Sequence, residues 1–450
     1  MREKRTVQSS LFEQYAEHEI GLELKAMSDW LDQQVDLLDW VAADVKQRHV
    51  EKTGRKGLTI ESVLRCAILK QYRQLSYDDL VFCLMDSTSC QTFARLTLAW
   101  TPKKSTLQSS ISAISDVTWE QINQRLLNSA EKAKKERGQM LRIDSTVIES
   151  PIHAPTDSTL LWDSVRVLVR LLKRAEALAE GITTIDYRNH QRVAKKRTRA
   201  IRYTRGQDKK APLYRDLIEA TRKSLDYVEQ ASIKLLAVMP FDPLACALWQ
   251  SQLSYYKPLI LNVIDQTERR VFQGEKVPAT QKIVSIFEEH TDIIVKGSRD
   301  VQYGHKLNLS TGRSGLILDV VIEEGNPADA DCFVPMLDRH IDQYGKAPRQ
   351  TAADGGYASI ANLHEAKARA VEDVAFHKKR GLKVEDMAKS PWVYRKLRNF
   401  RAGIEAGISL MKRTYGLGRC TWKGLNHFRA YVWSSVVAHN LALFGRLIST

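Results

Sequence analysis

Segments with the residue pattern of β-strands are confined to two parts of this chain, and their placement constrains the fold more than any other feature. The first expected strand is MLRIDSTVIES, residues 140–150. The others are DIIVKG (292–297), HKLNLST (305–311), LILDVVIEE (316–324), RQTAAD (349–354) and VEDVAFH (371–377). The stretches before, between and after these strands carry apolar residues at helical spacing. We therefore predict an α+β (α/β-like) fold, in which a mixed β-sheet is interrupted after its first strand by a helical insertion and closed by C-terminal helices.

Residues 1–137 are expected to form a helical N-terminal domain. TIESVLRCAILKQYRQ, residues 59–74, has apolar residues at helical spacing, and Ser76 begins a capping box for the next helix. Ser105 and Asp116 are the predicted N-caps of two further helices. Such a domain can bind DNA, but packing and dimerisation are equally open.

The chain carries a large excess of positive charge. Its 68 Lys and Arg residues against 53 Asp and Glu residues give a formal net charge of +15. This excess is typical of proteins that bind DNA or RNA, and the alternative is an ordinary enzyme that is basic.

The helical insertion, expected at residues 158–284, contains the densest basic segment. RNHQRVAKKRTRAIRYTRGQDKK, residues 188–210, holds ten Lys or Arg residues and one acid, Asp208. A charge run is usually a solvated helix face, but this run lacks interleaved acids, which favours contact with phosphates. The residues expected to bind DNA here are Arg192, Lys195, Lys196, Arg197 and Arg199.

Other features of the sequence argue against several classes of protein. The six cysteines are scattered and form no CxxC pair, which argues against a zinc ribbon or a disulfide framework and for a reducing compartment. No apolar run is long enough for a membrane span, and the N-terminus lacks the apolar core of a signal peptide, so we expect a cytoplasmic protein. Neither a P-loop nor an HExxH motif is present, so ATP and zinc are not expected.

Two aspartates occupy unusual positions at the expected strands. Asp144 lies in the middle of MLRIDSTVIES, although Asp is depleted in strands and is costly to bury unpaired. Asp354 ends the strand RQTAAD, and Gly355 and Gly356 after it allow a sharp turn and access to the carboxylate. An Asp before a Gly pair is most often only a turn residue, so Asp354 alone is ambiguous.

A third acidic position lies in the predicted helix RNFRAGIEAGISLMKRTYG, residues 398–416. Four charged residues share a stripe about 60° wide on this helix: Arg398, Arg401, Glu405 and Lys412. An apolar face lies nearly opposite, formed by Phe400, Ile404 and Met411. A solvent face with ordinary ion pairs is the alternative interpretation. Gly403 and Gly407 flank Glu405, and because glycine weakens a helix, they indicate close approach by another backbone.

Three carboxylates delivered by two strands and one late helix suit a hard divalent cation. Mg²⁺ and Mn²⁺ take oxygen ligands and keep open positions for water and phosphate oxygens. Two such ions about 3.5–4 Å apart can activate the attacking oxygen and stabilise the leaving oxygen in phosphodiester displacement. The candidate ligands are Asp144, Asp354 and Glu405. Spacing alone leaves Glu149, Asp157 and Asp163 open as substitutes.

These segments resemble bacterial insertion-sequence transposases of the DDE class, broadly the IS5-like and IS1182-like group. GLTIESVLRCAILKQYRQLSYDDLVFCLMDS is similar to their N-terminal module, and RIDSTVIES and HAPTDSTLLWDSVR to their first-Asp strand and the segment after it. GHKLNLSTGRSGLILDVVIEEGNPADA and AADGGYAS resemble the central strands and the second-Asp turn. The late helix is similar to the Y-(2)-R-(3)-E-(6)-K signature, in which Arg401, Glu405 and Lys412 match. Arg398 stands where the signature has Tyr.

The resemblance implies an RNase H-like catalytic core at residues 138–157 and 285–450, with Asp144, Asp354 and Glu405 as the catalytic triad and as ligands for Mg²⁺, with Mn²⁺ as a substitute. It implies a DNA transposase that binds terminal inverted repeats and target DNA as a homodimer or larger synaptic complex. Hydrolysis at each end would expose a 3′-OH that attacks the target, without a covalent protein–DNA intermediate. The expected location is the bacterial cytoplasm, on the nucleoid. Further residues expected to contact DNA are Arg398, Arg401, Lys412 and Lys306.

Two other functions stay open from the residues. A recombinase with a Tyr or Ser nucleophile is one, although His427-Phe428-Arg429 does not give the H-x-x-R spacing of a tyrosine recombinase. The other is a catalytically inactive or domesticated DNA-binding protein on a transposase fold, against which the intact set of three carboxylates argues.

Overall fold

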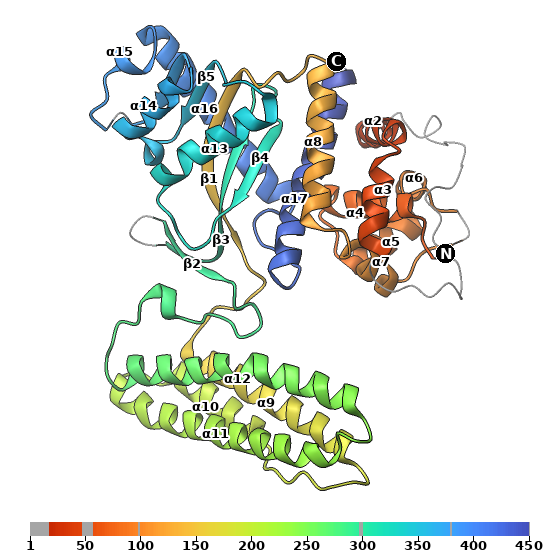
Figure 1. Cartoon of the computed structure of the whole chain (residues 1–450), viewed down its shortest axis with the longest axis vertical. Coiled ribbons are helices and arrows are strands. Elements are labelled where there is room, and N and C mark those ends of the chain that lie inside the picture. Colours follow the sequence, from red (N-terminus) through yellow and green to blue (C-terminus); the bar gives the residue numbers. More distant parts are fainter. Residues whose placement is uncertain (1–17, 47–56, 98–99, 297–299, 379, 450) are drawn as a thin grey trace. The chain divides into compact units, whose positions relative to one another are not determined.

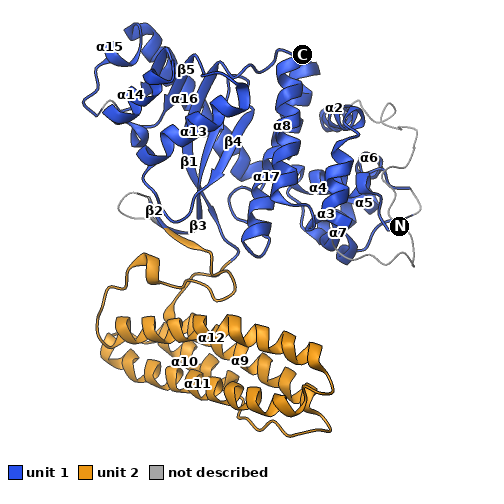
Figure 2. Cartoon of the chain, in the orientation of Figure 1, with its two compact units in different colours: residues 1–151, 294–450 blue, residues 152–293 orange. Residues whose placement is uncertain are grey.

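The computed structural model describes residues 18–46, 57–97, 100–296, 300–378 and 380–449 (Figure 1). The chain divides into two compact units, coloured separately in Figure 2. Unit 1 comprises Met1–Pro151 and Ile294–Thr450, and unit 2 comprises Ile152–Ile293. The insertion predicted at 158–284 lies within unit 2.

Within the described residues, the strands form one six-stranded mixed sheet. They are β1 (Met140–Glu149), β2 (Asp292–Lys296), β3 (Asp300–Thr311), β4 (Ile317–Ile322), β5 (Gln350–Ala353) and β6 (Asp373–Phe376). Their order is β2-β3-β1-β5-β6, with β4 also paired to β3. β3 runs antiparallel to β1 and β4, whereas β5 runs parallel to β1 and β6. The central position of β1 makes it the most rigid support that this sheet offers to a side chain.

The predicted mixed sheet, with a helical insertion after its first strand, is confirmed. β3 begins at Asp300, five residues before the predicted strand HKLNLST. Gly304 accounts for the short prediction, because glycine weakens a strand and reads as a break. In the structure Gly304 pairs with Glu149, and a Cβ at this glycine would collide with the backbone of Ile148. The glycine thus allows β1 and β3 to pair closely.

Helices cover the sheet and continue to the C-terminus: α13 (Asp329–Tyr344), α14 (Ile360–Ala368), α15 (Val384–Met387), α16 (Pro391–Thr414) and α17 (Leu425–Ser449). A short 3₁₀ helix, η3 (Gly355–Tyr357), follows β5. α16 packs against β1, β5 and β6, and α17 packs against the N-terminal helices (Figure 1). α16 therefore lies over the central strands of the sheet.

The described residues before β1 are helical: α2 (Glu19–Gln33), α3 (Leu37–Lys46), α4 (Ile60–Tyr72), α5 (Tyr77–Asp86), α6 (Thr88–Phe93), α7 (Lys104–Ile111) and α8 (Asp116–Lys132). The predicted capping box at Ser76 is confirmed, with Asp79 as its second member. The other two predicted caps are wrong. α7 already begins at Lys104, so Ser105 lies inside its first turn, and the hydroxyl of Ser115, one residue before Asp116, caps α8.

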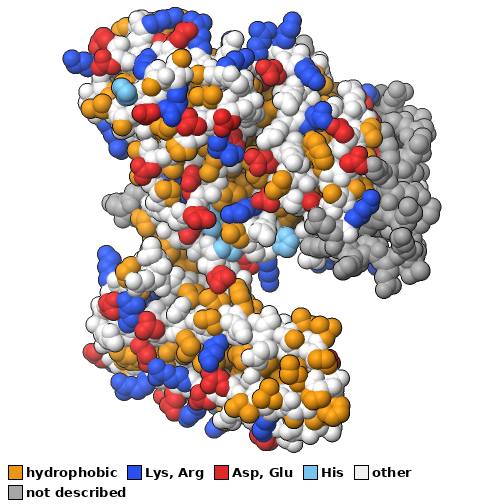
Figure 3. All heavy atoms as spheres, viewed as in Figure 1, with side chains coloured by type: hydrophobic (Ala, Val, Ile, Leu, Met, Phe, Trp, Pro, Cys, Tyr) orange, Lys and Arg blue, Asp and Glu red, His pale blue; other side chains and the backbone are white. Residues whose placement is uncertain are grey.

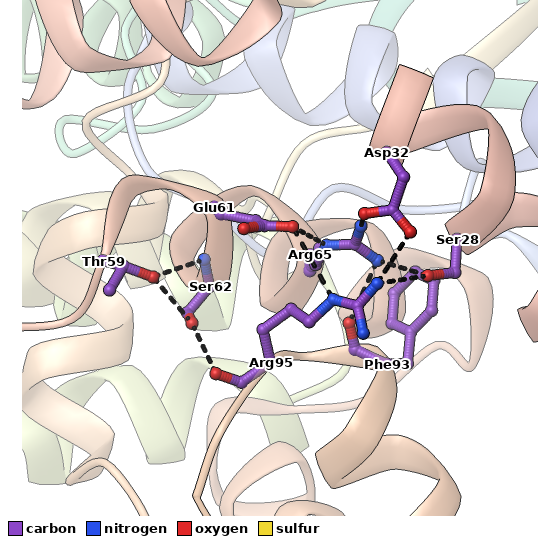
Figure 4. Close-up of polar contacts among 8 residues, drawn as sticks. All are labelled: Ser28, Asp32, Thr59, Glu61, Ser62, Arg65, Phe93 and Arg95. Atoms are coloured by element: carbon purple, nitrogen blue, oxygen red, sulfur yellow. Dashed lines mark hydrogen bonds and ion pairs between the residues drawn. The ribbon is translucent and has the colours of Figure 1, made fainter. Parts of the chain in front are cut away.

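Two buried arginines tie the N-terminal helices together (Figure 4). Arg65 on α4 donates to Glu61 and to Asp32 of α2, each at 3.0 Å, and to Ser28 at 2.9 Å. Arg95, just after α6, donates to the other oxygen of Asp32 at 2.7 Å. Burial lowers the pKa of the Arg65 guanidinium, and the Glu61 carboxylate opposes this shift. We call this group of residues the N-terminal arginine cluster. It stabilises the packing of α2, α4 and the segment after α6.

One hydrophobic core joins these N-terminal helices to the sheet. It includes Val63 and Ile68 of α4, Ile143 of β1 and Val437 of α17, each 0% exposed. The N-terminal helices and the sheet therefore form one compact unit.

Unit 2 is a helical bundle with its own core. Its helices are α9 (Asp157–Ala179), α10 (Gln191–Tyr203), α11 (Gln207–Lys234) and α12 (Pro243–Val271), with short 3₁₀ helices η1 (Leu235–Ala237) and η2 (Ala279–Gln281). Leu168, Leu217 and Trp249 are fully buried in it. The indole of Trp249 donates to the carbonyl of Leu171 at 2.9 Å, which satisfies its one polar atom.

In the part of the chain that the structure describes, none of the helices combines the length and the apolar character needed to cross a bilayer.

Candidate active site

Asp144 lies on the central strand β1, where it was predicted. Its backbone pairs opposite Leu309 of β3, and its Oδ1 accepts a hydrogen bond from the amide of Ser145 at 2.8 Å. The side chain is 15% exposed. The strand therefore holds this carboxylate in place while leaving one edge accessible.

Asp354 follows β5 directly and precedes η3. In the parallel pairing of β1 and β5, Ile143 lies opposite Ala353. Asp354, the first residue after β5, therefore lies beside Asp144, which is in the middle of the longer strand β1. The Gly355 backbone is not in the left-handed region. A Cβ there would lie 2.7 Å from the Cβ of Lys378, so the glycine serves close approach.

Glu405 is carried over the sheet by α16, and Arg142 fixes that helix. Arg142 lies two residues before Asp144 on β1, and therefore on the same face of the strand. Its Nε donates to Thr311 Oγ1 at 2.6 Å, and its Nη1 donates to the carbonyl of Phe400 on α16 at 2.7 Å. A Cβ at Gly403 would collide with the Arg142 guanidinium. The close approach predicted at Gly403 is thus made by a side chain. The same prediction at Gly407 is wrong, because among the described residues no atom beyond its own stretch of helix lies within 4 Å of a Cβ there.

The three predicted carboxylates meet at Arg401 on α16. Its Nη1 lies 3.2 Å from Asp354 Oδ1 and 3.7 Å from Asp144 Oδ2, and its Nη2 lies 2.5 Å from Glu405 Oε1. The Arg401 side chain is 7% exposed, whereas those of Asp354 and Glu405 are 42% and 60% exposed. We call these four residues the carboxylate site. It is buried on the cation side and open on the carboxylate side.

The donor set of the carboxylate site fits a divalent cation in chemistry and in charge. The atoms that the three carboxylates offer to a metal ion are all oxygens, which Mg²⁺ prefers. Three carboxylates and one guanidinium together carry a net formal charge of −2. Among the described residues, no three His, Cys, Asp or Glu side chains lie close enough together to hold one metal ion. The carboxylates therefore converge on the Arg401 guanidinium and not on one another.

A buried polar pair lies behind Asp144. The hydroxyl of Tyr357, in η3, donates to Asn308 Oδ1 on β3 at 2.5 Å. Burial and then the carboxylates of Asp329 and Asp144 raise the pKa of Tyr357, so its hydroxyl stays protonated as a donor. This pair links the turn after Asp354 to the sheet. Tyr357 follows the DGG turn at once, and this position is the signal that could have identified it.

The three acids left open as substitutes lie elsewhere. Glu149 ends β1, where its backbone pairs with the segment 418–420. Asp157 and Asp163 belong to unit 2, where Arg270 binds Asp157 at 2.9 Å and Arg166 binds Asp163 at 2.8 Å. The burial of these two acids in unit 2 raises their pKa, and their arginines oppose the shift. Asp157 and Asp163 thus have structural partners within the bundle.

The residues predicted to bind DNA fall into different environments. Arg398 is exposed on α16 and lies over the ring of Tyr394, and Lys412 is half-buried at the end of that helix. Lys306 is 4% exposed, and its ammonium lies 2.6 Å from Asp329. The ammonium of Lys306 also donates to the carbonyl of Pro327, so it is occupied within unit 1 and is not placed for the predicted contact with DNA.

The basic residues of α10 form one surface of unit 2. Arg192, Lys195, Lys196 and Arg199 are exposed, and Arg197 is half-buried with an ion pair to Asp216 at 2.8 Å. Within the described residues, the other four form no ion pair. The sequence prediction of a basic helix without interleaved acids therefore corresponds to a helix face rich in cations.

Comparison with known proteins gives a family match for the part of the chain that carries Asp354 and Glu405. Residues 288–441 match the family model of the transposase DDE domain. The matched segment contains Asp354, Arg401 and Glu405 and begins after β1, which carries Asp144. No curated protein and no solved structure matches the chain. The match supports the resemblance seen in the sequence, and the mixed sheet is consistent with the RNase H-like fold of that class.

Proposed function

Because residues 288–441 match the family model of the transposase DDE domain, we propose that the chain is a DDE-class transposase, which moves an insertion sequence by cutting and joining DNA at the carboxylate site. It would bind the terminal inverted repeats of its own element on the nucleoid. With Mg²⁺, or Mn²⁺ as a substitute, it would hydrolyse one phosphodiester at each end and join the exposed 3′-OH to target DNA.

The observation that carries this proposal is the convergence of Asp144, Asp354 and Glu405 on one guanidinium. Three side chains from β1, the turn after β5, and α16 reach Arg401 within 2.5–3.7 Å. Carboxylates that share a site repel one another. Arg401 offsets this repulsion, so the site can be assembled before any substrate arrives.

Asp144, Asp354 and Glu405 are the residues that would hold the divalent cation. When bound, such a cation supplies charge stabilisation to both the attacking and the leaving oxygen of an in-line displacement at phosphorus. The chain contributes rigidity, since Asp144 lies on a central strand and Glu405 on a helix that Arg142 fixes to the sheet. The exposed Arg398, one turn before Arg401, is placed to contact a backbone phosphate.

The basic face of α10 supports a second region of contact with double-stranded DNA. Its exposed arginines and lysines lie in unit 2, on a helix that carries no acid. Contacts of this kind supply affinity without reading sequence.

We further infer that the active assembly contains at least two copies of the chain, because two DNA ends must be held together. Unit 2 exposes large apolar side chains where α11 turns into α12, and Figure 3 shows them gathered at that end of the bundle. They are Ile233, Leu236, Met239, Phe241, Leu244 and Leu248. Contiguous exposed apolar surface of this kind marks association sites.

Sedimentation at several concentrations tests this association. Phe241→Asp with Leu244→Asp should give a monomer, while the control Val117→Asp, at an exposed apolar position of α8, should not change the assembly. An unchanged assembly in the double variant would place the interface elsewhere.

A second candidate function is a catalytically inactive DNA-binding protein on the same fold. The observation in its favour is that Arg401 already pairs with all three carboxylates. The exposure of the Asp354 and Glu405 side chains argues against this second candidate, because a purely structural cluster gains nothing from exposed carboxylates.

An incision assay separates these two candidates. The DNA that flanks the gene supplies the terminal repeats, and a labelled duplex of one repeat is incubated with Mg²⁺, with Mn²⁺ or with EDTA. We expect nicks with 3′-OH ends only in the presence of a metal ion, and none with Asp354→Ala, which should still bind the duplex. Binding without metal-dependent nicking by the wild type would establish the inactive protein.

A further inference from the structure

Unit 1 contains a second site, a cleft of about 720 Å³ between the N-terminal helices and the end of α16. Residues of α4, α5 and α7 line one side, and Lys412 with residues 416–422 line the other. Four cations reach it: Lys70, Lys104, Lys412 and Arg419. We call it the Lys70 cleft.

The two acids that line the Lys70 cleft are already engaged. Asp78 pairs with Lys104 at 2.5 Å, and Asp79 accepts a hydrogen bond from the Ser76 hydroxyl at 2.7 Å within the capping box of α5. These acids leave the cleft with more positive than negative charge, which suits an anion.

Lys70 is the unusual member of this group. It is 3% exposed, and its ammonium lies 4.9 Å from the ring centre of Tyr77 and 5.8 Å from that of Trp422. Within the described residues, no carboxylate and no hydrogen-bond acceptor reaches it. The burial lowers the pKa of Lys70 to about 8, so the amine is still mostly protonated at pH 7. Two aromatic faces stabilise a cation, but they leave the directed N–H groups of an ammonium without acceptors.

A second buried lysine in the same unit shows what is missing. Lys306 is 4% exposed, and its ammonium binds both the Asp329 carboxylate and the carbonyl of Pro327, each at 2.6 Å. A buried charge is normally paired in this way. Beside Lys70 an open cleft takes the position that the Asp329 carboxylate has beside Lys306. A ligand that pairs with the Lys70 ammonium there should therefore carry anionic oxygens.

The position of Lys412 indicates where those oxygens come from. Lys412 is seven residues after Glu405 on α16, which places it two turns farther along the same helix stripe. This distance of about 10.5 Å corresponds to roughly three nucleotide steps of a DNA strand. A strand that runs along this stripe with its reacting phosphate at Glu405 would bring a phosphate about three nucleotides away to the Lys70 cleft.

We propose that the Lys70 cleft binds a backbone phosphate of the reacting DNA strand, about three nucleotides from the reacting phosphate, with Lys70 as its buried contact. This inference rests on the proposed function. It gives the N-terminal helices a direct part in holding the strand at the carboxylate site, in addition to the contacts proposed for unit 2 and α16.

The test uses the full chain with Lys70→Met, and Lys306→Met as the matched control. The probe is a fluorescein-labelled duplex that carries one terminal repeat, titrated at several salt concentrations. For Lys70→Met we expect roughly 10-fold weaker binding and a salt slope reduced by about 0.9, the value for one phosphate that is no longer neutralised. Its Tm without DNA should stay equal or rise, because the variant removes a buried charge that lacks a partner. Lys306→Met should lower Tm, since it leaves Asp329 without its cation, and should keep the wild-type salt slope.

A second measurement locates the phosphate. Single uncharged methylphosphonates are placed in turn around the cleavage position, and one of them should weaken binding by the wild type but not by Lys70→Met. An unchanged salt slope for Lys70→Met, or a loss of Tm equal to that of Lys306→Met, would overturn the proposal. So would a Lys70-dependent rise of Tm in inorganic phosphate with no effect on DNA binding, which would identify a free anion as the ligand. If the wild type binds no duplex, the proposed function is rejected as well. If the wild type and Lys70→Met bind the duplex equally, only this inference is rejected.

Discussion

Two clusters of buried arginines and carboxylates lie in unit 1, and they differ in their charge balance. In the N-terminal arginine cluster, Arg65 and Arg95 face two carboxylates, those of Glu61 and Asp32. In the carboxylate site, Arg401 alone faces three. The first cluster is neutral in formal charge, while the second keeps a net formal charge of −2.

The two clusters also differ in exposure. The side chains of Arg65 and Glu61 are 1% and 5% exposed, while those of Asp354 and Glu405 are 42% and 60% exposed. A cluster that is neutral and buried holds helices together, and it has neither the net charge nor the access to bind an ion. An unbalanced and open cluster can accept a cation, because its arginine compensates only part of the carboxylate charge. Charge balance and exposure together therefore separate a structural cluster from a candidate reaction centre.

The largest expected effect comes from removing one carboxylate of the open cluster. Asp144→Asn should lower Mg²⁺-dependent nicking at least about 10³-fold. The variant removes a carboxylate ligand of the cation that stabilises the charge developing at the phosphate in the transition state. The Tm should hardly change, since the substitution reduces repulsion among the carboxylates. Glu149→Gln is the control, on the same strand but outside the carboxylate site, and should keep nicking within a few-fold. If both variants lost nicking equally, Asp144 would have no specific part in the reaction.

The sequence predicted much of this site because its signals are local. Asp144 is anomalous within one strand, Asp354 precedes two glycines, and Glu405 lies on a stripe that repeats with the helical period. The positions of the strands along the chain and the helical insertion also follow from local patterns, since β1 stands apart from the other strands in the sequence, whereas the order of the strands within the sheet was not predicted. The family match then includes Asp354 and Glu405 within residues 288–441.

What the sequence could not predict depends on distances between remote residues. Arg401 was expected to face phosphate with the rest of its stripe, but Arg142 binds the carbonyl of Phe400, 258 positions away, and draws α16 onto the sheet. Arg401 is then enclosed among carboxylates. Lys306 is likewise enclosed because Asp329, at the start of α13, packs against β3. Neither contact has a periodic or short-range signal.

The closed cluster should respond in stability and not in chemistry. Arg65→Met leaves Arg95 alone to balance the carboxylates of Glu61 and Asp32, and we expect the free energy of unfolding to fall by about 3–5 kcal/mol. Arg446→Met is the matched control, because Arg446 is 45% exposed and pairs with Glu23 at 2.7 Å, and should cost less than about 1 kcal/mol. Thermal and denaturant unfolding measure both. If Arg65→Met kept its stability and lost nicking, the contrast between the two clusters would fail.

The arginine of the open cluster provides a finer test. Arg401→Lys keeps the charge, but an ammonium lacks the planar fork with which Arg401 reaches three carboxylates. We expect nicking to fall about 10–100-fold, as for the loss of a group that orients metal ligands. The concentration of Mg²⁺ needed for half-maximal nicking should change as well. Wild-type nicking at every Mg²⁺ concentration would show that Arg401 does not organise the carboxylates.

The smallest effect concerns the α10 face of unit 2, where cations lie without carboxylates. Lys195→Ala with Lys196→Ala should reduce the salt slope of DNA binding by about 0.9 for each phosphate that the variant no longer neutralises, with only a few-fold loss of affinity. Lys223→Ala is the control, since Lys223 is also exposed in unit 2 but pairs with Glu219 at 2.6 Å, and it should leave the slope unchanged. Nicking at saturating DNA should be normal in both variants, because a phosphate contact remote from the chemistry affects binding alone. A lower slope in the control as well would mean that the whole surface of unit 2 attracts DNA and that α10 has no distinct part. If the salt slope of DNA binding is unchanged in the double variant, the basic residues of α10 form an ordinary solvated helix face that does not contact DNA.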